Sequence, residues 1–528
     1  MTDAVPARPG LLRSNVVVAV GTALSRVTGL VRIAALGYAL GLTLLADAYN
    51  LANSSPNILY ELLLGGVLSA ALVPLFTQHV EEDDADATSA VVTVALVALV
   101  VVTVLAVVAA PLVIRVYLDP SAPSYDTTVD LARLLLPEIL FYGWMALGSA
   151  LLNARRRFFA PAWAPVLNNV LVIAVVLLVA HILRDGEPEF LGWSDRTAVI
   201  TLLGVGSTLG IAVMSLALVP ALRRAGVRLQ PRFEPRHPAV ARLVRLSGWT
   251  VGYVAANQVA LVVVFRLAGG EGEGALSTYV YAFTFFQLPH GLLAVSIMTT
   301  FAPELARSFL RHDRRGFQAQ ASLGLRMTAL FVLPAAAAYV VLGRPLVSML
   351  LERGLLGGDD VGELGDTLSA FAVGLLGFSA YLFIVRCFFA RRDARTPFLL
   401  NVVENIANVV LAIVLVGSFG VQGLAAAYAV AYLVAAVLAF AVLESRVPGF
   451  DVRGLAGSVG RLVLAAVTAA LAGDVVADAV GDDTGWGAVA RSVAGGLTIA
   501  AVYVGLLLFL RVPEVDALRA RLSRARTS

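Results

Sequence analysis

Apolar residues fill most of this chain in long runs, separated by short clusters of glycine, proline and charged residues. A helix that spans a bilayer needs roughly 20 mostly apolar residues, and dividing the chain at the polar clusters predicts about fourteen such helices. An open strand edge cannot face lipid, so the sequence predicts an all-α polytopic membrane protein. The predicted segments are 12–39, 44–77, 88–117, 129–152, 160–183, 197–222, 241–268, 275–306, 319–350, 365–389, 397–418, 421–443, 457–478 and 488–510.

Composition agrees with this class. The 528 residues are 59% hydrophobic and only 14% charged, whereas soluble domains contain about 25% charged residues. A net charge of +3 is too small to indicate nucleic acid as a partner. The single cysteine, Cys387, excludes an intramolecular disulfide. The first apolar run has no clear small-residue cleavage site, so we interpret it as a retained span and not a signal peptide.

Arginine placement predicts the orientation of the chain. All 39 basic residues are arginine, and most lie in loops at 153–159, 223–245, 307–315 and 390–395 or in the tail 516–528. The alternate loops, 184–190, 269–274 and 358–366, are short and acidic. This is the positive-inside pattern of a plasma-membrane protein, and it predicts cytoplasmic N- and C-termini. The loop 79–87 is an exception, since it is acidic and lacks arginine.

Two weak internal matches suggest a repeat. At an offset of 236 residues (391 − 155), ARRRFFAP aligns with ARRDARTP, and Asn169 falls on Asn405. At 229 residues (303 − 74), VLSAALVPLF aligns with VSIMTTFAPEL. Parallel repeats with substrate bound between them are a transporter architecture, although any entry from a loop into a helix can look alike. We predict a lobe of about six helices at 1–225, a second such lobe at 226–445, and two further helices with a basic tail at 446–528.

The first segment contains two arginines, Arg26 and Arg32. Charge at the depth of a bilayer is costly and usually functional. Guanidinium groups bind phosphate through paired hydrogen bonds, so both arginines are predicted to bind an anionic, phosphorylated substrate. They point about 120° apart on a straight helix, but Gly29 and its neighbouring glycines permit a bend. The alternative is that the side chains extend to the cytoplasmic surface.

Further polar residues interrupt the apolar runs. Pro56 is predicted to kink the second segment, and Asn57 and Glu61 follow it as candidate substrate contacts. Glu138, which follows a proline in the fourth segment, is a further candidate substrate contact. Both carboxylates could pair with arginine or carry a proton, and a purely structural ion pair is the alternative. Asp47, after the first outer loop, is either solvated or part of an outer gate.

Other chemistry is not indicated. The sequence contains no metal-ligand cluster, Walker loop or nucleotide-binding domain, so we predict neither an enzyme nor a cofactor. Transport would then draw on the membrane potential or an ion gradient. In the second half we expect Arg386 and Glu404 to pair across adjacent helices.

The chain resembles a known family at several motifs. These are SRVTGLVR (25–32), DAYNLANSSPNIL (47–59), GGVLSAALVPLF (65–76) and LLNARRRFFAPAWAPVLNN (151–169). They resemble the MurJ (MviN) family of lipid II flippases, within the multidrug/oligosaccharidyl-lipid/polysaccharide exporter superfamily, and the likeness covers most of the chain. The sequence departs from the family pattern at Ile33, Tyr60 and Thr284, where many members carry a charged residue.

The resemblance implies a fold and a function. Two six-helix lobes would surround a central cavity, with two C-terminal helices beside them. The protein would move a lipid-linked peptidoglycan precursor from the inner to the outer leaflet by alternating access. Arg26 and Arg32 would contact its diphosphate and Asp47 would help close the outer gate. Membrane lipids and cell-wall synthesis or division proteins are the expected partners. The alternatives are a flippase for another polyprenyl-linked glycan, an ion-coupled exporter of cationic drugs, and a non-transporting cell-wall scaffold.

Overall fold

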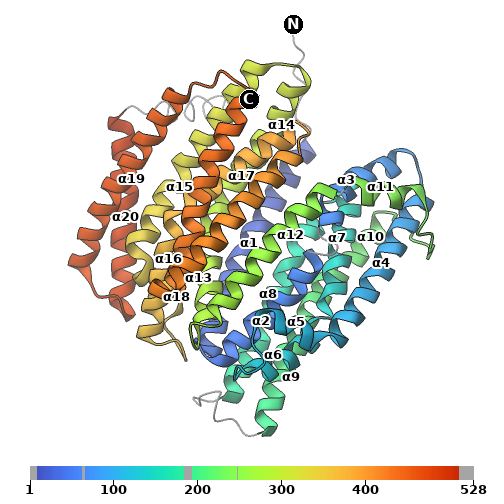
Figure 1. Ribbon diagram of the computed structural model, residues 1–528, viewed down its shortest axis with the longest axis horizontal. Coiled ribbons are helices and arrows are strands. Elements are labelled where there is room, and N and C mark those ends of the chain that lie inside the picture. Colours follow the sequence, from blue (N-terminus) through green and yellow to red (C-terminus); the bar gives the residue numbers. More distant parts are fainter. Residues whose placement is uncertain (1–8, 62–65, 184–192, 247, 511–528) are drawn as a thin grey trace. The chain divides into compact units, whose positions relative to one another are not determined.

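The computed structural model describes residues 9–61, 66–183, 193–246 and 248–510, and these residues form helices joined by turns and loops (Figure 1). Two compact units divide the chain, Met1–Gly269 and Gly270–Ser528. The division of the repeat at 225 and 445 stays a prediction. The first unit contains α1 (Pro9–Leu40), α2 (Leu44–Tyr60), α3 (Gly66–Glu81), α4 (Ala85–Val108), α5 (Ala110–Tyr117), α6 (Tyr125–Leu135), α7 (Glu138–Ala154), α8 (Phe159–Leu183), α9 (Trp193–Leu216), α10 (Leu218–Arg224), α11 (Pro238–Leu246) and α12 (Gly248–Ala268).

The second unit is also helical throughout its described residues. It contains α13 (Ala275–Pro289), a π-helical turn (His290–Ala294), α14 (Val295–Leu310), α15 (Arg314–Leu351), α16 (Gly358–Val373), α17 (Leu375–Ala390), α18 (Arg395–Arg446), α19 (Val452–Val480) and α20 (Gly485–Phe509). The all-α polytopic membrane fold is therefore confirmed.

The described residues contain 11 helices long and apolar enough to cross a membrane, or up to 12 if α16 and α17, bent by 46°, form one span. The difference from fourteen has two sources. The 52-residue α18 is counted as one spanning helix, but Gly420 breaks it with φ +53° and ψ −138°. The predicted segments 397–418 and 421–443 lie before and after this break. The predicted segment 44–77 falls on α2 and α3, and residues 62–65 between them lie outside the described chain.

The repeat is visible in the backbone of four turns. At the offset of 236, α7 and α17 end in the same turn, with φ of 58° at Arg156 and 60° at Arg392. The N–H of the following residue donates to the carbonyl of Leu152 in one turn and of Phe388 in the other, at 2.8 and 3.0 Å. At the offset of 229, the turns after α3 and α14 match in the same way, with φ of 52° at Asp83 and 57° at His312. Both turn pairs are thus equivalent in structure, as the repeat predicts.

Small residues let helices approach closely in both units. In the first unit, α1 packs on α8 at Gly21, where a methyl group would come within 2.8 Å of the indole ring of Trp163. In the second unit, α17 packs on α18 at Gly374 and Gly377. Without a hydrophobic driving force between helices in lipid, such close packing is a main source of helix association.

The last two helices pack on the second unit through an apolar cluster. It joins α15 to α19 and α20, and within it the hydroxyl of Tyr503 donates to the carbonyl of Leu330 at 3.0 Å. A kink at Leu342 bends α15 along this contact. The cluster includes Leu462, Ala465, Ala466, Ala469, Ile499 and Leu507. α19 and α20 therefore belong to the same compact unit as α13–α18.

The close approach of α17 and α18 can be tested at Gly377. A methyl group there would lie 2.8 Å from the backbone N and Cα of Leu433, and backbone cannot move aside cheaply. We expect Gly377→Ala to lower the stability by about 1–3 kcal/mol, measured as thermal unfolding in detergent. Gly496→Ala in α20 is the control, because nothing lies within 4 Å of a methyl group there. Equal unfolding midpoints for both variants would contradict tight α17–α18 packing.

Candidate functional site

The predicted site residues of the first unit occupy α1, α2 and the start of α7. α1 runs from Pro9 to Leu40 as one helix, so no break turns Arg26 toward Arg32. The two arginines are about 9 Å apart along the axis, from six residues at 1.5 Å each. Arg26 is exposed, whereas Arg32 is half-buried. They therefore have different surroundings, and their predicted joint binding of a substrate stays a prediction.

Arg26 and Gly29 lie in the part of α1 that is hydrogen-bonded to α8. The side-chain amide of Asn169 donates to the carbonyl of Ser25 at 3.0 Å and to the hydroxyl of Thr28 at 2.9 Å. A methyl group at Gly29 would lie at an ordinary 3.7 Å from that amide nitrogen. This contact fixes the rotation of α1, and it leaves the Arg26 side chain exposed.

Arg32 faces a buried polar cluster formed by α2, α7 and α9. Its guanidinium interacts electrostatically with Glu138 and with the hydroxyl groups of Tyr49 and Tyr142. The Tyr49 hydroxyl lies 2.8 Å from that of Ser207 on α9. Tyr49 is only 2% exposed. The cluster thus brings one predicted residue from α1 and one from α7 together around two tyrosines that the sequence analysis missed.

Glu138 is the most enclosed charge in this cluster. Its side chain is 0% exposed, and it begins α7 directly after Pro137, where α6 has ended. The nearby hydroxyl of Thr208 donates instead to the carbonyl of Leu134 at 2.7 Å. Among the described residues, neither carboxylate oxygen receives a hydrogen bond of good geometry. A buried carboxylate without donors depends on a nearby positive charge, and Arg32 supplies it.

The predicted residues of α2 are distributed along the helix. Asp47 is buried in the first turn, where the positive end of the helix favours a carboxylate. The structure therefore excludes the alternative that Asp47 is solvated. α2 continues through Pro56, and the hydroxyls of Ser54 and Ser55 donate to carbonyls one turn earlier. These two hydroxyls add hydrogen bonds to backbone carbonyls in the turn before the proline.

Asn57 and Glu61 lie beyond Pro56 at the end of α2. The side chain of Asn57 is exposed, and that of Glu61 is half-buried. The N–H of Glu61 donates to the carbonyls of Asn57 and Ile58. The structure therefore brings neither side chain into the Arg32 cluster through a described contact, and their role in substrate binding stays a prediction.

One expectation in the second unit was wrong. Arg386 is exposed on α17, and Glu404 is 2% exposed on α18, with Tyr279 as an electrostatic neighbour. No ion pair joins Arg386 to Glu404 in the described chain. The two residues are on adjacent helices, but they face opposite environments, which sequence spacing alone does not reveal.

Comparisons with known proteins agree with the sequence motifs. A sequence model of the family described as "Lipid II flippase MurJ" matches residues 36–480. A protein of Rhizobium meliloti (strain 1021), named "Probable lipid II flippase MurJ", is 31% identical over 464 residues, 86% of this chain and 84% of its own. A protein of Vibrio cholerae with the same name is 27% identical over 531 residues, 96% of this chain and 97% of its own.

Solved structures show the same fold. "Lipid II flippase MurJ, inward closed conformation" superposes with a TM-score of 0.77 at 21% identity, over 94% of this chain and 99% of that one. A transporter titled "Inward-facing conformation of a multidrug resistance MATE family transporter of the MOP superfamily" follows at 0.65 and 15% identity, over 80% and 94%. At such low identity these likenesses establish the fold alone.

The dependence of Glu138 on Arg32 predicts an energetic coupling. We expect Arg32→Ala to lower the stability by about 1–3 kcal/mol, because the carboxylate charge of the buried Glu138 then loses the guanidinium that stabilises it. Adding Glu138→Gln removes that charge and should restore about 1–2 kcal/mol. Unfolding midpoints of the two single variants and the double variant in detergent measure this coupling.

Arg26 offers a matched control on the same helix. Because its side chain is exposed, the effects of Arg26→Ala and Glu138→Gln should add. If the stability changes of Arg32→Ala and Glu138→Gln also add in the double variant, Arg32 does not stabilise the charge of Glu138.

Proposed function

The chain belongs to the lipid II flippase MurJ family, and we propose that it moves lipid II, the undecaprenyl-diphosphate-linked peptidoglycan precursor, from the inner to the outer leaflet by alternating access. The observation that carries the proposal is the family match over residues 36–480, which begins just after Arg32 and includes Tyr49 and Glu138 of the cluster that Arg32 faces. It is a multi-pass protein of the inner membrane. The arginine-rich loops support cytoplasmic N- and C-termini.

The chemistry of α1 supports an anionic lipid-linked substrate. A diphosphate needs cationic donors that stay charged at any physiological pH, and guanidinium meets this need. Arg26 offers an exposed guanidinium, and Arg32 lies two turns further along the same helix. We assign both to the diphosphate, with Asn57 and Glu61 as candidate contacts to the polar part of the substrate.

Glu138 and Asp47 have other roles in this proposal. Glu138 is fully buried and attracts the Arg32 guanidinium electrostatically, so we assign to Glu138 the positioning of Arg32 and not a direct contact with an anion. Asp47 at the start of α2 contributes to the outer gate. Gly29 and Pro56 shape α1 and α2. The membrane potential or an ion gradient supplies the energy, without a cofactor.

Cells depleted of their own lipid II flippase test the function. We expect the wild-type chain to restore growth and the appearance of lipid II at the outer surface. Arg26→Ala and Arg32→Ala should each reduce this signal by about tenfold or more, since each removes a charge-assisted contact. Arg26→Lys keeps the charge without the paired geometry, so it should fall between alanine and arginine.

Arg133→Ala is the control, because its exposed ion pair with Asp130 is far from α1 in sequence and contributes little. Membrane levels of all variants are compared by immunoblot. Full rescue by both alanine variants would assign the two arginines a structural role only. If the wild-type chain is well expressed but does not restore growth of the depleted cells, its substrate would be a different lipid-linked glycan.

A further inference from the structure

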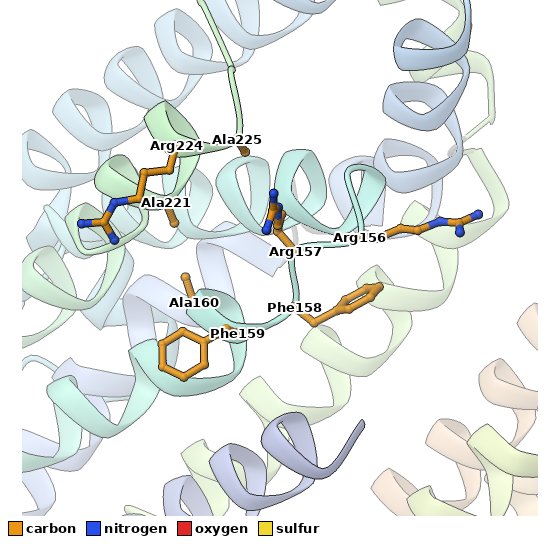
Figure 2. Close-up of a pocket in the computed structure, with 8 residues that line it drawn as sticks. All are labelled: Arg156, Arg157, Phe158, Phe159, Ala160, Ala221, Arg224 and Ala225. Carbon is orange, nitrogen blue, oxygen red and sulfur yellow. The ribbon is translucent and has the colours of Figure 1, made fainter. Parts of the chain in front are cut away.

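A basic pocket opens at the turn between α7 and α8. Its cavity of about 370 Å³ is lined by the turn residues 156–160 and by Ala221, Arg224 and Ala225 from the end of α10. We use "basic pocket" for this set of residues. The lining contains three arginines and no carboxylate. Figure 2 shows that Arg157 and Arg224 come from different elements and that the side chain of Arg156 points away from both.

The arginines of the basic pocket are not occupied by acidic side chains. Arg156, Arg157 and Arg224 are exposed, and none of them takes part in an ion pair within the described chain. Clustered guanidiniums repel each other, so a pocket of this kind favours a bound anion. The nearby Arg155 and Arg223 add to the same positive field.

The internal repeat allows the α7–α8 turn to be compared with its equivalent between α17 and α18. In the equivalent turn of the second unit, Asp393 stands where Arg157 stands here, and its carboxylate accepts hydrogen bonds from the N–H and the hydroxyl of Thr396 at 3.0 and 2.7 Å. Burial pushes the pKa of Asp393 up, but these hydrogen bonds and the charge of Arg446 outweigh it and hold the pKa below its usual value. The first turn of α18 is thus held by a negative charge.

The other two turns of this type use the same device. Each carries an aspartate directly after the residue with positive φ, and its carboxylate accepts from a backbone N–H of the next helix at 2.8 Å: Asp84 from Ala87, and Asp313 from Gly316. Only the α7–α8 turn among these four has an arginine instead. The residue of α8 that corresponds to Thr396 is Ala160, and no carboxylate accepts from its N–H in the described chain.

The surface beside the basic pocket is suited to lipid. Phe158 is 37% exposed and Phe159 is 61% exposed, and the ring of Phe159 stacks on Trp163 at 5.6 Å. Tryptophan rings such as that of Trp163 are typical of the membrane interface, and the exposed phenylalanines beside it give the basic pocket an apolar border. Basic pockets between spanning helices at this level take phosphate headgroups. A free anion would use the arginines alone, whereas a lipid would use these rings as well.

We propose that the basic pocket binds the phosphate headgroup of an anionic phospholipid, which takes the place that Asp393 fills in the second unit. The phosphate lies against Arg157, Arg224 and the first turn of α8, and the acyl chains lie along Phe158 and Phe159. An arginine can then occupy the place of the aspartate, because the turn receives its negative charge from the membrane.

Full-length protein in a neutral detergent tests this proposal. Dioctanoyl phosphatidylglycerol should raise the unfolding midpoint in a saturable manner, and dioctanoyl phosphatidylcholine should not. Arg157→Asp restores the aspartate of the other three turns, so the lipid-free protein should be at least as stable as wild type. Its affinity for phosphatidylglycerol, and that of Arg224→Gln, should be about tenfold lower.

Arg228→Gln is the matched control, because Arg228 is exposed in the loop that follows α10 but does not line the basic pocket. It should keep the affinity of wild type. Equal responses to phosphatidylglycerol and phosphatidylcholine would overturn the proposal, as would unchanged binding by Arg157→Asp. Inorganic phosphate that reproduces the stabilisation at the same concentration would also overturn it, since the pocket would then bind a free anion.

Discussion

The hydrocarbon core of a bilayer has no water to satisfy a polar group, and this constraint shapes every part of the chain. It explains why the described residues are helical and why helix breaks occur at special sequences. Gly420 supplies the positive φ that divides α18. Pro137 separates α6 from α7 at the point where Glu138 enters the interior. Each break exposes backbone groups, so breaks are where polar side chains gather.

A buried charge is the most costly case of the same constraint. Glu138 is fully enclosed, no donor in the described part of the chain makes a hydrogen bond of good geometry to its carboxylate, and the positive charge of Arg32 stabilises its ionised form. Arg32 lies on α1 and Glu138 at the start of α7. Their attraction therefore links α1, the helix to which we assign substrate binding, to the break between α6 and α7. Any movement of α1 along its axis changes this attraction. The cluster is therefore suited to link substrate binding to a rearrangement within the first unit.

Local sequence predicts the elements well and their contacts poorly. Apolar run length fixed the spans, because the bilayer sets that length regardless of the neighbours. The turn motif ARR was enough to align Arg156 with Arg392, since a turn is a local structure. The contact between Tyr49 and Ser207 joins residues 158 positions apart, and nothing local encodes it. Arg386 and Glu404 were paired wrongly for the same reason, since the rotation of each helix depends on packing.

The repeat separates structural residues from functional ones by comparison within one chain. Arg155 and Arg391 occupy equivalent turns, and in each a buried guanidinium nitrogen lacks a hydrogen-bond partner among the described residues, so the two turns share this feature of their structure. Positions where the two units carry different residues distinguish the chemistry of one unit from that of the other. Glu138 corresponds to Gly374 at the offset of 236 (374 − 138), where even a methyl group would come within 2.4 Å of the Ala429 backbone. The second unit has no room for a carboxylate at this position, so the electrostatic interaction of Arg32 with Glu138 has no counterpart there.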